Sequence, residues 1–98
     1  MSQFHVFRLD DGTLFLDLQS DNVDTGSRVG TALVPLEHAP TAIDRFEAVF
    51  KVDGRDYLMR LDALAAVRQA LLPRTPIADL THEDYAIRRG LDLLFSGN

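Results

Sequence analysis

Residues 14–36 read LFLDLQSDNVDTGSRVGTALVPL and contain two extended segments separated by a polar loop. Three leucines occupy alternate positions of the first segment: Leu14, Leu16 and Leu18. This period of two is typical of a β-strand with one buried face. Residues 20–28 are rich in Ser, Asp, Asn and Gly, which favour loops. Residues 31–36 resume as a short strand, which we expect to lie at an edge or to end near Pro35, because proline lacks an amide donor.

Two hairpins are predicted on either side of this block. Residues 4–9 and 13–19 flank Asp-Asp-Gly, whose residues tolerate the positive φ of tight turns. Residues 46–52 and 55–61 flank Asp-Gly, a strong signal for a two-residue hairpin. We expect core positions for the strand phenylalanines: Phe4, Phe7, Phe15, Phe46 and Phe50. Five strands in all predict a small antiparallel sheet that curls toward a barrel.

Helical segments are predicted in the second half of the chain. Residues 62–72 hold good helix formers between an N-terminal Asp and Pro73, which predicts a short helix.

The segment before the second predicted hairpin, residues 37–44, is predicted to be an irregular connection.

The last element is predicted to be a helix that begins at Thr81, with Asp84 completing a capping box. One face of this helix is apolar and contains Ile87, Leu91 and Leu94. Asp84 and Arg88 are spaced to form an ion pair across one turn. Gly97 is suited to end the helix.

Length and composition predict a single domain over residues 1–98. The chain is 46% hydrophobic and 26% charged, as is usual for globular proteins. It has no apolar run long enough for a membrane span and no basic start typical of a signal peptide. The absence of cysteine excludes disulfides and is compatible with a reducing compartment. We therefore expect a cytoplasmic protein.

The charge argues against nucleic acid as the main partner. The formal net charge is −5, and the cationic residues are scattered from Arg8 to Arg89 without forming a basic stripe. Nucleic-acid binding depends on clustered Lys and Arg that neutralise phosphates. A protein partner is therefore expected, with no direct sequence-specific binding of nucleic acid.

No catalytic, metal or cofactor site is predicted. The three histidines, His5, His38 and His82, lack the spacing of metal ligands. Residues 82–84, His-Glu-Asp, could form an acid–base cluster, but carboxylates in a first helical turn more simply complement the helix dipole. Asp17, Asp21 and Asp24 lack the glycine turn and terminal Glu of a calcium loop. We expect Asp21 and Asp24 to bond their own loop backbone.

The motifs of nearly the whole chain, in order and spacing, resemble the CcdB family of toxins. They are Gln3-Phe4, LFLDLQSDNVDT from Leu14, VPL at 34–36, VFKVDGRDY at 49–57, ADLTH at 78–82, Ile87, LDLLF at 91–95 and Gly97. The resemblance implies a mainly β, α+β fold: a five-stranded antiparallel SH3-like barrel of CcdB/MazF/Kid type with a C-terminal α-helix. It also implies a homodimer.

The resemblance implies an activity as well. CcdB toxins belong to type II toxin–antitoxin modules, bind the A subunit of DNA gyrase and trap the cleaved-DNA complex. They are inhibitors of a topoisomerase and not catalysts. A cognate CcdA-like antitoxin neutralises them with a disordered segment that folds on binding.

The target-binding residues implied by the resemblance are altered in this chain. The family surface combines a final Trp-Gly-Ile, an Asn one turn earlier, and paired Ile residues after Gln-Ser-Asp. The corresponding residues here are Asn22, Val23, Asp92, Ser96, Gly97 and Asn98. Only Gly97 matches, and Val23 is a mild change. Losing an aromatic anchor typically costs about 2–4 kcal/mol, or roughly 30- to 1,000-fold in affinity.

Two other functions stay open. The altered tail fits a non-toxic relative that binds antitoxin but not gyrase. A MazF/Kid-like endoribonuclease has the same barrel, and fold does not fix function. The early Gly-Asp strand start and the Arg-Pro strand of those enzymes are not found in this sequence.

Overall fold

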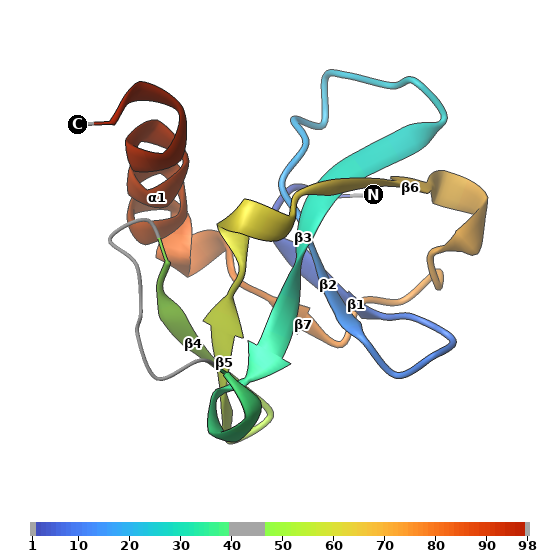
Figure 1. Cartoon of the computed structure of the whole chain (residues 1–98). Coiled ribbons are helices and arrows are strands. Elements are labelled where there is room, and N and C mark those ends of the chain that lie inside the picture. Colours follow the sequence, from blue (N-terminus) through green and yellow to red (C-terminus); the bar gives the residue numbers. More distant parts are fainter. Residues whose placement is uncertain (1, 40–46, 98) are drawn as a thin grey trace.

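A computed structural model describes residues 2–39 and 47–97 of the chain. Its strands are β1 (His5–Arg8), β2 (Leu14–Asp17), β3 (Ser27–Pro35), β4 (Val49–Val52), β5 (Arg55–Met59), β6 (Ala65–Arg68) and β7 (Ala78–Asp79). The helices are α1 (Asp84–Ser96) and four 3-10 turns: η1 (Leu36–His38), η2 (Leu61–Ala63), η3 (Gln69–Leu71) and η4 (Thr81–Glu83). The strand order is β4-β5-β3-β2-β1-β7, and β6 pairs with β3 beside this path. A nearly closed antiparallel barrel with a C-terminal helix results (Figure 1), which confirms the predicted fold class. The predicted number of five strands is wrong, because the described residues form a sheet of seven strands, including the short β6 and β7.

Both predicted hairpins are present. β1 and β2 pair antiparallel, with Val6 opposite Leu16 and Phe7 opposite Phe15. β4 and β5 are joined by Asp53-Gly54, in which both residues have positive φ as a two-residue hairpin turn requires. β3 ends at Pro35 as predicted but begins at Ser27, earlier than the predicted residue 31. The start of the predicted strand at residue 46 lies outside the described residues.

The helix predicted over residues 62–72 is wrong. Those residues form η2, β6 and η3, and β6 pairs antiparallel with the first half of β3, from Ser27 opposite Arg68 to Gly30 opposite Ala65. β5 pairs only with the last residues of β3, from Leu33 to Pro35. The first half of β3 therefore needs another partner for its backbone groups. This long-range pairing outweighs the helix propensity of the Ala- and Leu-rich segment.

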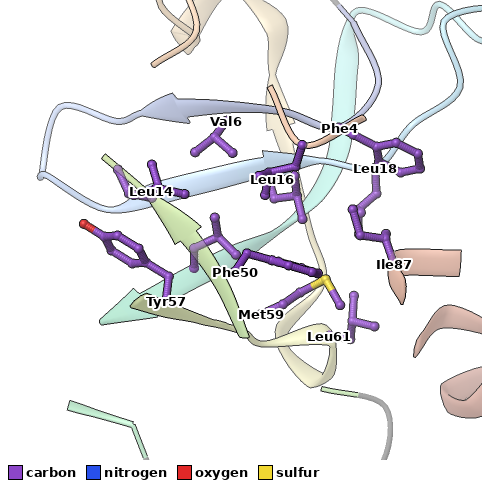
Figure 2. Packing of buried hydrophobic residues seen from close by; sticks show 13 residues of the cluster. Phe4, Val6, Leu14, Leu16, Leu18, Phe50, Tyr57, Met59, Leu61 and Ile87 are labelled. Carbon is purple, nitrogen blue, oxygen red and sulfur yellow. The ribbon is translucent and has the colours of Figure 1, made fainter. Parts of the chain in front are cut away.

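β2 is buried on both faces, so the expectation of one buried face is also wrong. Its leucines face the main core cluster, which Figure 2 shows: Phe4, Val6, Leu14, Leu16, Leu18, Leu33, Phe50, Val52, Tyr57, Met59, Leu61, Leu80 and Ile87. On the other face Phe15 packs with Phe7 and Leu72, and Val67 of β6 lies against them. The segment that was expected to be a helix thus covers the second face of β2. The expected core phenylalanines are buried, apart from Phe46, which lies outside the described residues.

The C-terminal helix has the predicted apolar face and end. Ile87 is fully buried, and Leu91 and Leu94 pack against the main cluster. Asp84 and Arg88 form the expected ion pair. Gly97 ends α1 with a left-handed conformation, and its N–H donates to Leu93 O at 3.0 Å. No helix among the described residues is both long and apolar enough to cross a membrane.

The predicted capping box at the start of this helix is wrong. The Thr81 side chain donates to Asp79 Oδ1 instead of capping the following turn, and the Thr81 N–H donates to the same oxygen at 2.8 Å. These two hydrogen bonds lower the pKa of Asp79 below its usual value. The helix start is therefore tied to β7 through one carboxylate.

Gly30 allows a close approach between β3 and β2. A Cβ atom at this position would lie 2.2 Å from Leu16 O and 2.4 Å from Phe15 Cζ. We expect Gly30→Ala to lower the free energy of unfolding by about 1–3 kcal/mol, because β2 or the Phe15 ring must move. Urea unfolding measures this loss. Ala65→Ser, exposed on β6 opposite Gly30, is the control and should stay within about 0.5 kcal/mol. An unchanged midpoint for Gly30→Ala would contradict the close contact.

Candidate functional site

The predicted target-binding residues lie in two places on the surface. Asn22 and Val23 are in the loop between β2 and β3, where the Val23 side chain is 47% exposed. Asp92 and Ser96 are exposed on the last turns of α1, and Gly97 is its C-cap. In Figure 1 the loop and the C-terminal end of α1 both lie toward the top of the view. Asn98 lies outside the described residues.

The N-terminal segment connects these two places. The Gln3 N–H donates to Asp21 Oδ1 at 2.7 Å, and the Gln3 side-chain amide donates to Leu18 O at 3.0 Å. From α1, Arg88 Nη2 donates to Gln3 Oε1 at 3.4 Å. The Arg88 guanidinium also lies over the Phe4 ring, 5.4 Å from its centre. A short chain of polar contacts therefore runs from α1 to the loop.

The two loop carboxylates behave differently. Asp24 accepts the Gly26 N–H at 3.3 Å, which confirms the expected bond to its own loop. The same expectation is wrong for Asp21, which accepts the N–H of Gln3 and lies 3.6 Å from Arg28 Nη2. Asp21 therefore anchors the loop to other segments.

A buried ion pair lies at the base of the loop. Asp17 is 0% exposed and Arg28 is 4% exposed, and Arg28 Nε donates to Asp17 Oδ2 at 2.8 Å. The second Asp17 oxygen accepts the Gln19 N–H at 3.0 Å, while Arg28 Nη2 donates to Gln19 O at 2.8 Å. Sequence reasoning missed this pair. The available signal was an Asp inside an apolar strand and an Arg at the end of the polar loop.

The Gln19 side chain forms hydrogen bonds with the backbone of the loop and of β3. Its Oε1 accepts the Val29 N–H at 3.0 Å, and its Nε2 donates to Val23 O at 2.8 Å. The Ser20 hydroxyl oxygen accepts the Asn22 N–H at 3.2 Å. The backbone of residues 19–23 is therefore held by side chains, and Val23 is presented outward.

Two aromatic side chains of α1 are exposed to solvent. Tyr85 is 76% exposed and Phe95 is 72% exposed. Phe95 precedes Ser96 and lies three residues after Asp92, so it adds an apolar group to the predicted target-binding positions. Exposed aromatic residues are enriched at protein-binding surfaces. The sequence analysis gave Phe95 no functional role, because its position near the end of the predicted helix carries no sign of its exposure.

The polar residues near β1 and β7 form a cross-strand contact. His5 Nε2 lies 3.5 Å from Asp79 Oδ2, and the two residues are opposite each other in the β1–β7 pairing.

Within residues 2–39 and 47–97, no group of three or more His, Cys, Asp or Glu side chains is arranged to hold a metal ion. The β2–β3 loop and the end of α1 expose apolar side chains and carboxylates, and the loop backbone is held by side-chain hydrogen bonds. These features are suited to binding another macromolecule.

Comparison with known proteins gives one family match. The family model described as CcdB protein matches residues 3–97. No curated protein matches the chain. Among solved structures, an endoribonuclease from mycobacterial species is similar, with a TM-score of 0.76 and 14% sequence identity. That match covers 98% of this chain and 91% of the other. At this identity the structural likeness shows the fold alone.

Proposed function

This chain belongs to the CcdB family, and on that premise we propose that it is a toxin that binds the A subunit of DNA gyrase. The family places it in a toxin–antitoxin module. We infer that it traps the complex of gyrase with cleaved DNA. We further infer that it is cytoplasmic, that residues 1–98 form a single CcdB-like domain, and that two copies of the chain form a homodimer. A CcdA-like antitoxin is its inferred neutralising partner.

The observation that carries the proposal is the family match over residues 3–97. It includes both places that hold the predicted target-binding residues, the β2–β3 loop and the end of α1. Support comes from the exposure of Val23, Asp92 and Ser96 on a fold of the expected class. The exposed Phe95 supplies an aromatic group next to Ser96, where the family has its tryptophan.

Induced expression without antitoxin tests the proposal in a host that carries the matching gyrase. We expect growth arrest and accumulated DNA breaks, because a poison converts gyrase into a source of broken DNA. A Val23→Asp variant, expressed to the same soluble level, is the control. It should be less toxic, since it places a charge at an exposed apolar contact. If cells grew normally while the unmodified protein was verifiably expressed in soluble form, the proposal that it poisons gyrase would be rejected.

A non-toxic relative that binds antitoxin is the second candidate, and the altered tail favours it. Asp92 and Ser96 replace the family's Asn and Trp, so the gyrase contacts are the part of the surface that has changed. Titration of the purified protein against a gyrase A fragment and against the antitoxin separates the two. Binding to the antitoxin alone identifies the non-toxic relative.

We propose a binding poison and not a nuclease, although the barrel is similar to that of an endoribonuclease. Incubation of the purified protein with a long RNA tests this difference. If the protein produced defined RNA fragments, and if adding the antitoxin prevented their formation, the protein would be an endoribonuclease.

A further inference from the structure

We propose that Asp17 and Arg28 are positioning residues that set the conformation of the β2–β3 loop, residues 18–26, and thereby the affinity for the gyrase A subunit. The affinity part rests on the proposed function. Both side chains are buried, so they act through the loop and not by touching the target.

The first step is the fixed backbone of Gln19. Asp17 accepts its N–H at 3.0 Å and Arg28 donates to its carbonyl at 2.8 Å, while the two charged groups bind each other at 2.8 Å. The backbone of residue 19 is thus held on both sides by one charge pair. Hydrogen bonds to charged groups in a buried environment are the stronger kind.

The second step carries this geometry to the exposed part of the loop. With its backbone fixed, Gln19 directs its side chain to Val23 O at 2.8 Å and to the Val29 N–H at 3.0 Å. These contacts close the loop on itself across residues 19–29. Val23, an implied target contact, is therefore two hydrogen-bonded links away from the buried pair.

The third step reaches the other half of the candidate surface. Arg28 Nη2 lies 3.6 Å from Asp21, which accepts the N–H of Gln3 at 2.7 Å. Gln3 in turn accepts a hydrogen bond from Arg88 of α1. The buried pair therefore belongs to one connected set of polar contacts that includes the loop and the helix carrying Asp92 and Ser96.

Stability alone does not require an ion pair at this position. Replacing a buried ion pair by apolar side chains of similar size is often neutral or stabilising. Apolar side chains cannot, however, reproduce the bonds to the Gln19 N–H and carbonyl. A loop without those bonds samples more conformations and must be ordered on binding, which weakens affinity.

The test compares the unmodified protein with the double variant Asp17→Leu/Arg28→Met. Urea unfolding reports stability, amide hydrogen exchange by NMR reports loop order, and calorimetric titration with a purified gyrase A fragment reports affinity. We expect a similar unfolding midpoint, about 10-fold faster exchange at the Gln19 and Val29 amides, and about 10-fold weaker binding. The β4–β5 amides should exchange as before.

Two further variants support the comparison. Lys51→Gln/Asp56→Asn removes an exposed ion pair of 3.1 Å in the β4–β5 hairpin and should change none of these properties. Gln19→Met leaves the buried pair intact but removes the contacts to Val23 and Val29. It keeps the inference testable if the double variant does not fold, and it should also give faster exchange at Val29 and weaker binding.

The outcomes separate the inference from the proposed function. Unchanged exchange at the loop amides of a folded variant overturns the positioning role. Faster exchange with unchanged affinity overturns the link to binding. If the unmodified protein does not bind the gyrase fragment, the proposed function fails together with the affinity part. Faster loop exchange in the variant then still supports the pair as the element that sets the loop.

Discussion

Arg28→Ala is expected to lower the free energy of unfolding by about 3–5 kcal/mol. The substitution leaves the Asp17 carboxylate fully buried without its cation, and it leaves the Gln19 carbonyl without the Arg28 donor. A buried charge without its partner is more costly than the small cavity left by the missing side chain. Urea unfolding followed by circular dichroism gives the loss directly.

The control for this experiment is Arg68→Ala, an exposed arginine on β6. It should change stability by no more than about 0.5 kcal/mol. The Asp17→Leu/Arg28→Met variant should be much more stable than Arg28→Ala, because it removes both charges together. A loss below about 1 kcal/mol for Arg28→Ala would show that water reaches Asp17 in solution and that the pair is not buried as described.

Ser96→Trp is expected to tighten binding to the gyrase A fragment by roughly 30- to 1,000-fold. Ser96 is the last residue of α1, it is exposed, and the left-handed Gly97 turns the chain directly after it. A tryptophan at this position would lie next in sequence to the exposed Phe95 and enlarge the aromatic part of the surface. Large aromatic side chains that become buried at an interface contribute most of its binding energy.

Thr75→Trp is the matched control, because it adds the same side chain to an exposed residue between η3 and β7. Calorimetric titration and growth arrest on induced expression should respond to Ser96→Trp and not to Thr75→Trp. Equal gains for both would indicate non-specific adhesion. An unchanged dissociation constant for Ser96→Trp would contradict the assignment of this position to the target surface.

The parts of the fold that could be predicted are those set by neighbouring residues. The Asp53-Gly54 turn needs positive φ at two successive positions, so its sequence identifies the hairpin. The apolar face of α1 follows from the 3.6-residue period. Residues 62–72 could not be assigned in this way, because β6 exists through its pairing with β3, more than thirty residues earlier. A helix-forming composition contains no sign of that pairing.

In the candidate site, too, contacts between neighbouring residues could be predicted from the sequence and contacts between distant residues could not. Asp24 bonds an amide two residues away, and this contact is predictable from the loop sequence. Asp21 bonds Gln3, and Asp17 bonds Arg28, across 18 and 11 residues. Asp17 looks like a solvent-facing residue on an alternating strand until the second face of β2 is known to be covered. The implied target contacts came from family resemblance, since exposed polar residues carry no periodic signal.

β6 is joined to the sheet through β3 alone in the part of the chain that the structure describes. One edge of this strand therefore presents unpaired backbone groups beside the small, exposed Ala65 and Ala66. Such an edge can pair with a strand of another molecule and seed aggregates. Its length of four residues and the charge of Arg68 oppose that growth. Association through the β6 edge is therefore restrained by the shortness of the strand and by one charge.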